Sequence, residues 1–464
     1  MPKEHVIVGG GPAGLYAIET IREYDKEGAI TLVCDEPVYS RMSLPYYLAG
    51  NIPAEHLVTG SPDFFRALNV RPALGKRATA VDTKGNRVTL DDGSSLPYDS
   101  LLIATGSAAQ RLPIPGADQP NVINLWTLDD AKRALTKAKP GANVVFIGAG
   151  FIGFIILNAM AKVGCKLSVV EIEEQILPRM LDAPGATLVR KWLTDKGVGV
   201  FTGTRVTEIG QLTDGRKNVR LSDGRALTAD LVVVATGIQP NIDLVKGSDI
   251  KTAQGILVNN QLQTSVANVY AAGDVAQGPD LLTGRQEIHA VQPTAQDHGR
   301  IAGANMAGQN LRYEGSLLMN ILDVIGLHCT SFGLWRDDGR EMKMISNASR
   351  PVYRKLLFEG DRIVGAILIG PADDVSMLND MGMVKGFIQT KTALGPWKQH
   401  LLKQPLDIRR PYIACKVAEK LLQSTLLKMP TPNRQYRFRN LQPTIKPNPA
   451  HQVLVGTRPA VEHL

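Results

Sequence analysis

The pattern of apolar and polar positions at the start of the chain predicts a strand, a glycine-rich turn and a helix. Residues 5–8 are a largely apolar run leading into G-x-G-x-x-G, and apolar positions then recur with helical spacing from 15 to 21. A second apolar run, Ile30–Cys34, ends at two acidic residues. In such a β-α-β unit the glycines allow a tight turn, close approach of a pyrophosphate to the backbone, and packing of the helix on the strand. The positions that we assign to this site are Gly9, Gly11, Pro12, Ala13, Gly14, Asp35 and Glu36.

The same pattern occurs a second time in the middle of the chain. Residues 143–147 form an apolar run before another glycine-rich turn, and residues 167–170 form the next strand, which ends at Glu171. Two complete units predict two dinucleotide sites. A carboxylate after the second strand accepts a hydrogen bond from a ribose 2′-OH and repels a 2′-phosphate, so Glu171 favours NAD over NADP. The positions of the second site are Gly148, Gly150, Phe151, Ile152, Gly153 and Glu171.

This order of motifs resembles the flavoproteins of the pyridine nucleotide-disulfide oxidoreductase superfamily. Three further segments carry the resemblance: Leu101–Gly106, Val232–Gly237 and Thr264–Asp274. It covers roughly residues 4–310, fades through about residue 420 and does not include the tail. The resemblance implies FAD at the first glycine turn and NAD at the second, with Asp274 on the ribityl chain of the flavin. It adds Ala104, Thr105, Gly106, Gly237, Gly273 and Asp274 to the cofactor-binding positions.

The segment from Pro37 to Gly50 departs from the disulfide reductases of that superfamily. Those enzymes have cysteines here beside the flavin, and the single-cysteine members place theirs where this chain has Met42. Dithiol chemistry is therefore excluded, and we expect no catalytic residue beyond the flavin itself. The spacing of Tyr39 and Arg41 resembles the ferredoxin, rubredoxin and nitrite reductase flavoproteins. We expect Arg41 to contact an FAD phosphate or ribose.

A second departure concerns the nicotinamide. The superfamily commonly has a Glu after the third glycine of the NAD turn that pairs with a Lys of the first insert. Here these regions read Phe154-Ile155 and Pro45-Tyr46. Loss of only one partner would leave a buried charge unpaired, so the joint loss is physically coherent. It predicts an apolar nicotinamide pocket with Phe151 and Ile155 as candidates for its wall, although both residues also suit ordinary helix packing.

A helix that begins near Pro293 completes the predicted flavin site. Proline is favoured at a first helical turn, and the positive end of the helix dipole would face the flavin pyrimidine and stabilise negative charge there. His289 and His298 are either proton carriers or structural residues, and the sequence leaves this open.

The motifs predict an α/β fold with two Rossmann-like domains, a smaller C-terminal α/β domain and an extended tail. The third domain should contain strands near residues 355–358 and 363–369, and the tail is basic and proline-rich, so that it either wraps a neighbouring subunit or remains disordered. The expected boundaries are 1–115 and 244–312 for the FAD-binding domain, 116–243 for the NAD-binding domain, 313–425 for a C-terminal interface domain, and 426–464 for the tail.

Composition narrows the setting in which the protein works. No apolar stretch approaches the roughly 18 to 20 residues that cross a bilayer, and the first strand begins too early to leave room for a signal peptide. The four cysteines lack a C-x-x-C motif, which indicates the reducing cytoplasm and excludes an iron-sulfur cluster or another metal site held by this chain alone. The net charge of +8 suits solubility or attraction of an acidic partner, but it is not gathered into a run typical of nucleic-acid binding.

These features predict an FAD-containing NAD(H) oxidoreductase subunit. It would exchange electrons with an iron-sulfur protein or with a larger complex, since the chain most resembles the FAD subunits of tungsten aldehyde oxidoreductases and phenylglyoxylate dehydrogenase. One alternative is a free-standing NADH-dependent reductase of the ferredoxin or rubredoxin type. Another is a flavoprotein resembling apoptosis-inducing factor, which works partly by binding other macromolecules.

Overall fold

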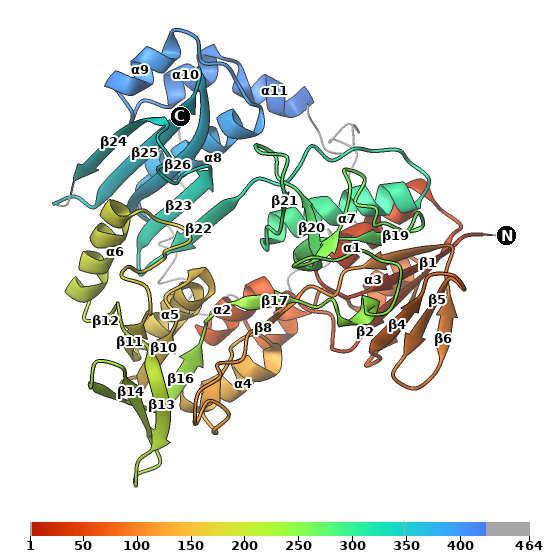
Figure 1. The fold of residues 1–464 in the computed structure, drawn as a ribbon, viewed down its shortest axis with the longest axis horizontal. Coiled ribbons are helices and arrows are strands. Elements are labelled where there is room, and N and C mark those ends of the chain that lie inside the picture. Colours follow the sequence, from red (N-terminus) through yellow and green to blue (C-terminus); the bar gives the residue numbers. More distant parts are fainter. Residues whose placement is uncertain (1, 348, 424–464) are drawn as a thin grey trace, which may run out of the picture.

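The computed structural model describes residues 2–347 and 349–423, so the predicted basic tail at 426–464 lies outside the described residues. Three sheets with their helices stand side by side (Figure 1). Two of these sheets are parallel and the third is antiparallel, which confirms the predicted fold class of two Rossmann-like domains and a C-terminal α/β domain. Within the described residues, no helix combines the length and the apolar character needed to span a bilayer.

The first parallel sheet is built from two segments that are far apart in the sequence. Its strand order is β19-β7-β1-β2-β3, and all neighbouring strands run parallel. The central strands are buried on both faces, which explains their continuous apolar sequence. The strands are β1 (Glu4–Val8), β2 (Ala29–Cys34), β3 (Val70–Leu74), β7 (Ser100–Ile103) and β19 (Val269–Ala271).

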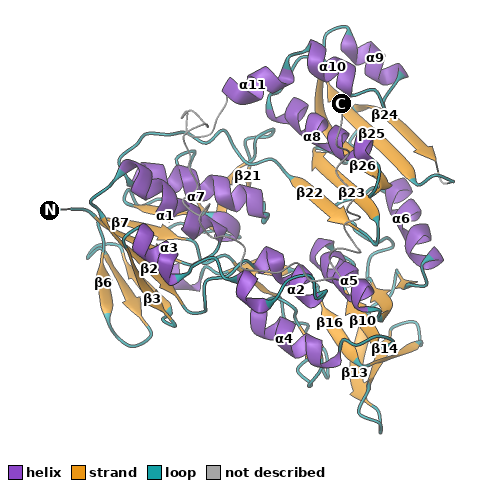
Figure 2. Ribbon diagram, turned by 180° about the vertical axis from the view of Figure 1, so that it is seen from behind, coloured by secondary structure: helices purple, strands orange, loops and turns teal. Residues whose placement is uncertain are grey.

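Helices α1 (Pro12–Tyr24) and α7 (Gln292–Met306) pack tightly against each other beside this sheet (Figure 2). Glycines of α7 make the close approach possible. A Cβ atom on Gly299 would lie 2.3 Å from the carbonyl oxygen of Ala13, and one on Gly303 would lie 2.7 Å from that of Ala17. The packing therefore brings the chain from residue 292 onward against the first glycine turn.

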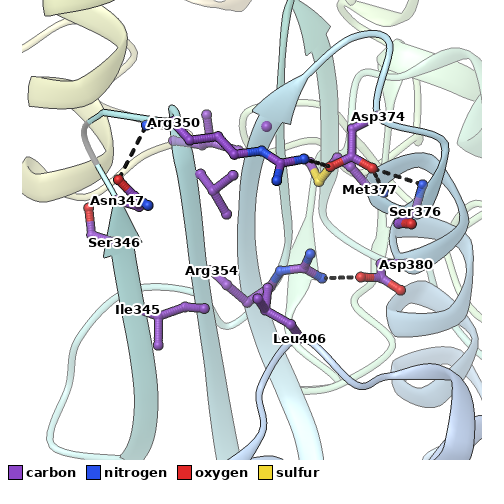
Figure 3. A pocket seen from close by; sticks show the side chains of 13 residues that line it. Ile345, Ser346, Asn347, Arg350, Arg354, Asp374, Ser376, Met377, Asp380 and Leu406 are labelled. Atoms are coloured by element: carbon purple, nitrogen blue, oxygen red, sulfur yellow. Dashed lines mark hydrogen bonds and ion pairs between the residues drawn. The ribbon is translucent and has the colours of Figure 1, made fainter.

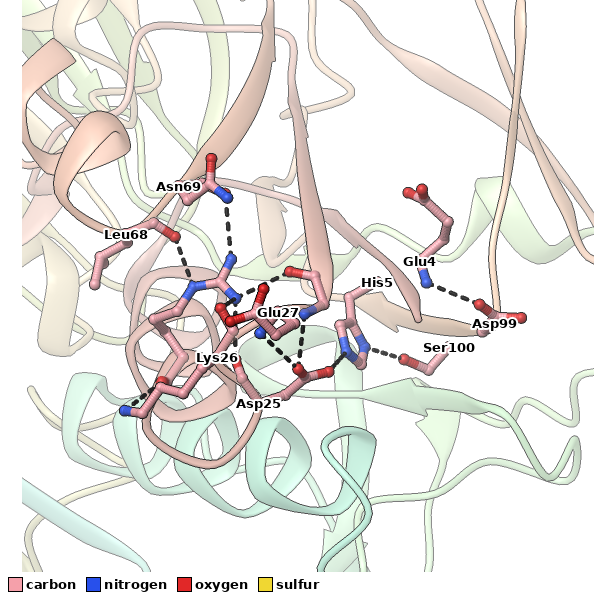
Figure 4. A network of polar contacts seen from close by, with 11 residues as sticks. Glu4, His5, Asp25, Lys26, Glu27, Leu68, Asn69, Asp99 and Ser100 are labelled. Carbon is pink, nitrogen blue, oxygen red and sulfur yellow. Dashed lines mark hydrogen bonds and ion pairs between the residues drawn. The ribbon is translucent and has the colours of Figure 1, made fainter. Parts of the chain in front are cut away.

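A polar network fixes the amino-terminal end of β1 (Figure 4). The His5 ring lies 2.7 Å from Ser100 Oγ through Nδ1 and 3.0 Å from Asp25 Oδ2 through Nε2. Burial lowers the pKa of His5, although Asp25 opposes this shift. Arg22 closes the same region by donating to the carbonyl oxygens of Asp25, Gly28 and Leu68. The network ties α1 to β1 and β7 at the edge of the sheet opposite the glycines.

The second parallel sheet has the order β12-β11-β10-β16-β9 and carries the second glycine turn. An antiparallel hairpin sheet, β13-β14-β15, extends from it. The chain passes between the two parallel sheets twice. The two connecting segments contain the short strands β8 and β17, which pair with each other in antiparallel orientation. The elements are β8 (Ser107–Ala109), β9 (Val122–Ile123), α4 (Leu128–Lys137), β10 (Asn143–Ile147), α5 (Phe151–Val163), β11 (Lys166–Val170), α6 (Ala183–Asp195), β12 (Gly199–Phe201), β13 (Val206–Gln211), β14 (Lys217–Leu221), β15 (Ala226–Ala229), β16 (Leu231–Val234) and β17 (Ile238–Pro240).

The third sheet is antiparallel with the order β22-β23-β26-β25-β24, and α8 packs on β26 and β23. Its two longest strands contain the positions at which the sequence predicts strands. The elements are β22 (Met319–Asp323), β23 (Leu327–Gly333), β24 (Glu341–Asn347), β25 (Val352–Glu359), β26 (Arg362–Pro371), α8 (Val375–Gln389), α9 (Trp397–Lys403), α10 (Arg409–Ala414) and α11 (Val417–Gln423).

Smaller elements complete the fold around the first sheet. They are the 3-10 turns η1 (Arg41–Ser43), η2 (Ala54–Leu57), η3 (Asp243–Val245) and η4 (Gly273–Val275), helices α2 (Leu44–Leu48) and α3 (Pro62–Ala67), the antiparallel sheet β4 (Ala78–Asp82), β5 (Arg87–Leu90) and β6 (Ser95–Pro97), and the sheet β18 (Ile256–Leu257), β20 (Ala276–Pro279) and β21 (Gln286–Glu287).

A buried ion pair joins the second sheet region to the third. Asp182, which caps the start of α6, accepts hydrogen bonds from Tyr353 Oη at 2.6 Å and from Lys355 Nζ at 3.0 Å. Trp192 of α6 donates to the carbonyl oxygens of Val324 and Ile325 in the turn between β22 and β23. Because Lys355 is only 2% exposed, this contact holds the two regions together through a cation with little access to water.

Removing the cation of this link should destabilise the protein. In Lys355→Met the Asp182 carboxylate would remain largely buried without its counter-charge, at a cost of about 2–3 kcal/mol. Urea unfolding followed by tryptophan fluorescence measures this, since Trp192 lies in the interface. Lys191→Met is the matched control, because Lys191 is on the exposed side of the same helix and pairs only with Asp195. Equal midpoints for the two variants would contradict the structural role of the buried pair.

Candidate functional site

The first glycine turn leaves the start of α1 open. A Cβ on Gly9 (φ +115°) would lie 2.1 Å from the carbonyl oxygen of Ala104, and one on Gly14 would lie 2.1 Å from that of Gly9. Among the residues that the structure describes, no atom lies within 4 Å of where a Cβ on Gly11 would be. Gly11 caps α1 without any side-chain hydrogen bond, and Pro12 occupies the first turn. The free N–H groups and the open space fit a pyrophosphate at this helix end.

The second glycine turn repeats this arrangement at the start of α5. A Cβ on Gly148 (φ +100°) would lie 2.5 Å from the carbonyl oxygen of Ala235, and one on Gly153 would lie 2.9 Å from that of Gly148. Gly150 again has no atom of residues 2–347 or 349–423 near its missing Cβ, and within that part of the chain it caps the helix without a side-chain hydrogen bond. Phe151 and Ile152 form the first turn of α5. This helix end therefore fits a second pyrophosphate.

Glu171 lies beside the second turn and already accepts two backbone hydrogen bonds. Its Oε2 accepts from the N–H of Ala149 at 2.7 Å, and its Oε1 accepts from the N–H of Glu173 at 3.1 Å. Each carboxylate oxygen has two lone pairs, so both can still accept a hydrogen bond from a ribose hydroxyl. The backbone contacts fix the orientation of the carboxylate at the edge of the sheet where the glycines lie.

The strand register shows that Cys34, rather than Asp35 or Glu36, matches Glu171 in the first unit. The N–H of Gly9 donates to the carbonyl oxygen of Val33, and the N–H of Gly148 donates to that of Val170. The next residues along the two strands, Cys34 and Glu171, therefore occupy equivalent positions. The Cys34 thiol is buried next to the N–H groups of Gly10 and Glu36, and burial raises its pKa. Sequence reasoning missed this residue because the acids that follow it have the spacing expected for a ribose contact.

The two acids after Cys34 have different partners. Asp35 pairs with Arg77, with 2.9 Å between Oδ2 and Nη2. Glu36 accepts a hydrogen bond from Tyr39 Oη at 2.8 Å and forms an ion pair with Arg41. The structure thus brings Glu36 and Arg41 of the predicted site together and holds Asp35 in a separate pair.

Tyr39 connects this cluster to the second sheet region. Its hydroxyl also accepts from the N–H of Leu128 at the start of α4. Burial, assisted by Glu36, raises the pKa of Tyr39 to about 12. Arg41 lies 5.6 Å from the ring centroid of Trp126, which precedes α4. A contact of Arg41 with FAD stays a prediction, and these neighbours fix where its guanidinium lies.

Asp274 lies where α1, α7 and the crossing strands converge. A Cβ on Gly273 would lie 3.3 Å from Ala13 Cβ and 3.5 Å from Ala295 Cβ, and the positive φ of +78° favours glycine at this position. The Asp274 carboxylate accepts from Ser107 Oγ at 2.8 Å. Burial raises the pKa of Asp274, while Ser107 and Arg41 act in the opposite direction.

The crossing strands are locked next to Asp274. Thr105 Oγ1 donates to the carbonyl oxygen of Asn241 at 2.9 Å, and Asn241 Nδ2 donates to that of Thr105 at 2.8 Å. Gly106 and Gly237 both have positive φ, and they directly precede the paired strands β8 and β17. With Pro293 in the first turn of α7, residues predicted for the flavin site from distant parts of the sequence therefore lie in one region of the fold, around Gly273 and Asp274.

His298, which sequence reasoning left open, is a buried neutral residue beside Gly273. Its Nδ1 accepts from the N–H of Gly273 at 3.4 Å, and its ring packs edge-on against Tyr313. Burial, assisted by the charge of His289, lowers the pKa of His298 to about 3. His298 therefore supports the Gly273 turn in its neutral form, a long-range role that no local pattern indicates. His289 is also buried, and Ser316 Oγ lies 2.8 Å from its Nδ1.

The first insert packs directly on the second glycine unit. Helix α2 contacts α5, and Leu48 and Phe154 are fully buried in a shared apolar cluster, with Phe151 and Ile155 partly buried against it. The contact between the two units is therefore apolar, and the predicted apolar nicotinamide pocket stays a prediction. Met42 lies on η1 just before α2, and all four cysteines of the chain are free.

A matched pair of substitutions separates the two turns. The methyl group in Gly11→Ala or Gly150→Ala meets no atom of the described residues, so each substitution should cost only about 0.5 kcal/mol of stability. Gly11→Ala should weaken FAD binding roughly tenfold, equivalent to about 1.4 kcal/mol, and leave the affinity for NADH unchanged. Gly150→Ala should do the reverse. Fluorescence titration of apoprotein with FAD and steady-state kinetics with NADH measure the two effects, and the opposite assignment would show that the sites are exchanged.

The neutral His298 should make the protein sensitive to acid. Because its folded pKa lies below the unfolded value, the unfolded chain binds the proton more strongly, and stability falls as the pH falls from about 6.5 towards 3 by up to about 1.4 kcal/mol per pH unit. His298→Gln, which keeps a hydrogen-bond acceptor without titrating, should flatten this part of the stability curve. Melting temperatures from pH 7.5 to 4.5 measure it, with the exposed His56→Gln as control. Parallel curves for all three proteins would contradict this role.

Comparison with known proteins places the chain in a family. Residues 3–299 match the family model of the pyridine nucleotide-disulphide oxidoreductases, and residues 319–381 match the rubredoxin NAD⁺ reductase C-terminal domain. The chain is 33% identical over 417 residues to the NADH-dependent phenylglyoxylate dehydrogenase subunit epsilon of Aromatoleum evansii, a match that covers 88% of this chain and 96% of that one.

Two further similarities extend this result. A nitrite reductase [NAD(P)H] of Bacillus subtilis (strain 168) is 31% identical over 412 residues, covering 87% of this chain but 49% of that protein, so the chain spans about half of its length. The crystal structure of a putidaredoxin reductase in covalent complex with putidaredoxin superposes with a TM-score of 0.79 at 26% identity, covering 89% of this chain and 99% of the other. The chain therefore belongs to the pyridine nucleotide-disulphide oxidoreductase family and is an FAD-dependent NAD(P)H oxidoreductase whose cofactors are FAD and NAD.

Proposed function

We propose that this enzyme passes electrons between NAD(H) and a separate iron-sulfur protein, as the FAD subunit of a larger oxidoreductase complex. The observation that carries this proposal is the thiol-free insert. The segment packed on α5 has Met42 where family members with a thiol beside the flavin have a cysteine, and the four cysteines are single free thiols. A flavin without a neighbouring dithiol must exchange electrons with a group outside the chain.

The relatives support a protein as that outside group. The Aromatoleum evansii relative is named as a subunit of an NADH-dependent phenylglyoxylate dehydrogenase, and the putidaredoxin reductase was crystallised together with putidaredoxin. By analogy, the partner of this chain would carry the organic chemistry, for example as a tungsten aldehyde oxidoreductase. The free thiols agree with a reducing compartment, and we place the enzyme in the cytoplasm.

In the proposed site, different residues of this chain bind different parts of FAD and NAD. Bound FAD supplies hydride exchange with the nicotinamide and single-electron exchange with the partner. The helix starts at Gly11 and Gly150 would hold the two pyrophosphates, Asp274 the ribityl chain of FAD, and Glu171 the ribose of NAD. The first turn of α7 would place its positive dipole end beside the flavin pyrimidine, and Phe151 with Ile155 would exclude water from the nicotinamide.

A free-standing NADH-dependent reductase of the rubredoxin or ferredoxin type is the second candidate function. It is favoured by the match of residues 319–381 to the rubredoxin reductase C-terminal domain. In that case the purified protein alone, as a monomer or homodimer, would turn over rapidly with a small carrier protein. The fold and the two dinucleotide sites would be the same in both cases.

Purification of the untagged native protein distinguishes the two candidates. Co-purification of stoichiometric iron-sulfur or tungsten subunits, with NAD⁺ reduction by the assembly, is the result expected for the complex. A yellow protein that purifies alone and reduces rubredoxin or ferredoxin with NADH would overturn the subunit role in favour of the free-standing reductase.

The assignment of Glu171 to the ribose has its own test. Glu171→Ala should raise the KM for NADH roughly tenfold or more, equivalent to about 1.4 kcal/mol of lost binding, and should leave FAD retention unchanged. Steady-state kinetics and the flavin content of the purified variant measure both effects. Glu208→Ala is the control, since Glu208 lies on the hairpin sheet paired with Arg220. Equal loss of FAD and NADH binding would contradict a separate NAD site at Glu171.

A further inference from the structure

The charged residues around the cavity of the C-terminal domain pair with each other (Figure 3). This cavity of about 420 Å³ lies between α8 and the third sheet. Arg354 Nη1 lies 2.9 Å from Oδ2 of Asp380, and Arg350 Nη2 lies 3.7 Å from Oδ2 of Asp374. Each arginine therefore has its counter-charge within the chain, and these pairs require no charged ligand.

Arg41 of the predicted FAD site differs from these arginines, because its partner Glu36 is itself held by a third residue. Tyr39 Oη donates to Glu36 Oε2 at 2.8 Å, while Arg41 pairs with the other oxygen of the same carboxylate. The Arg41 side chain is 38% exposed. A guanidinium has five N–H donors, so Arg41 keeps donors for an anion while Glu36 fixes its position.

Tyr39 connects this pair to the start of α4. Its hydroxyl accepts from the N–H of Leu128 at 2.9 Å. Thr127 and Asp130 form a capping box that satisfies their own two N–H groups, so Tyr39 supplies the acceptor for a helix N–H that the box leaves over. Because burial, assisted by Glu36, raises the pKa of Tyr39 to about 12, the hydroxyl remains protonated at neutral pH and keeps its donor on the carboxylate.

Trp126 links Arg41 and Asp274 to the same helix start. The Arg41 guanidinium lies 5.6 Å from the centroid of the Trp126 ring, within the range of a cation–π contact. The indole N–H donates to the carbonyl oxygen of Ser107 at 2.9 Å, and the Ser107 hydroxyl donates to Asp274 at 2.8 Å. Two side chains that we expect to contact FAD are therefore connected through residues 126–128.

Helix α4, which begins at these contacts, belongs to the second sheet region rather than to the first. It follows β9, which pairs with β16 of the second sheet. Ala131 and Ala134 of α4 are fully buried in the same apolar cluster as Phe146 of β10, and the Tyr39 side chain lies in this cluster as well. The contacts therefore join the predicted FAD site to the region that carries the second glycine turn.

We propose that Tyr39 is a positioning residue of the FAD site, which holds Glu36 and Arg41 in place by anchoring them to the start of α4. FAD affinity then depends on contacts with the second sheet region, and not on the first Rossmann-like domain alone. This inference rests on the proposed function, because it takes Arg41 as a residue that contacts FAD. Without the Tyr39 hydroxyl, Glu36 and Arg41 gain rotamer freedom, and FAD binding must then order both side chains.

Tyr39→Phe in the full chain tests this role, with the dissociation constant of FAD as the readout. Fluorescence titration of the apoprotein should show FAD bound roughly tenfold more weakly than by the wild type, equivalent to about 1.4 kcal/mol. Tyr98→Phe is the matched control. It removes the hydroxyl of another buried tyrosine of the first sheet region, one that has no hydrogen-bond partner among the described residues. This control should keep the wild-type affinity.

A double-mutant cycle with Arg41→Gln separates positioning from a general structural effect. If Tyr39 acts through Arg41, Tyr39→Phe should change FAD affinity by less than about twofold in the Arg41→Gln background. Full additivity of the two substitutions would overturn the proposal. Wild-type affinity in Tyr39→Phe, with weak binding in Arg41→Gln, would overturn the positioning role and leave the assignment of Arg41 standing. Wild-type affinity in Arg41→Gln would overturn both.

Leu128→Pro decides the matter if Tyr39→Phe does not fold. Proline is tolerated at the first position of a helix, and Thr127 already has the extended backbone that a following proline requires. The substitution removes the N–H that donates to Tyr39, so FAD should bind at least about threefold more weakly. An unchanged dissociation constant would contradict the anchor to α4.

Discussion

Two helix N-termini that have no side-chain cap determine the rest of this structure. Within the described part of the chain, no side chain caps α1 at Gly11 or α5 at Gly150, and no atom fills the space beside the missing Cβ of either glycine. Such an end is stable only when water or an anion takes the hydrogen bonds. At the other glycines of the two turns, a Cβ would lie about 2–3 Å from a backbone carbonyl oxygen. These positions therefore tolerate almost no other residue. The parallel sheets serve to hold these two ends at fixed places.

The connections between the domains explain how one chain serves two cofactors. The double hydrogen bond between Thr105 and Asn241 locks the crossing strands beside Asp274, and α2 reaches from the first sheet region onto α5 of the second. The Asp182–Lys355 pair then fixes the second region to the C-terminal domain. The nicotinamide of NAD and the flavin would then be held between elements whose relative positions are fixed by these contacts. Geometry of this kind favours hydride exchange by positioning alone.

Local patterns predicted most of the fold, because glycine spacing and apolar runs depend on neighbours in sequence. Both β-α-β units, the helix at Pro293 and the strands of the third sheet follow from such patterns. Contacts between distant segments could not be read in this way. The equivalence of Cys34 and Glu171 depends on which strand residue accepts the hydrogen bond from the glycine turn. The role of His298 depends on its contact with Gly273, which lies 25 residues away in the sequence. The domain boundaries and the cofactor contact of each site residue stay predictions, and the basic tail lies outside the described residues.

The central proposal is that this chain holds no redox centre besides FAD, so that electrons must leave the flavin to a group outside the chain. Anaerobic titration of the FAD-loaded protein with dithionite, followed by its visible absorption, tests this claim most directly. The account predicts that the flavin is fully reduced by two electrons per FAD, with no further uptake. Uptake of four electrons per FAD, or a long-wavelength band from a thiolate in contact with the flavin, would show a redox-active thiol in this chain and contradict the account.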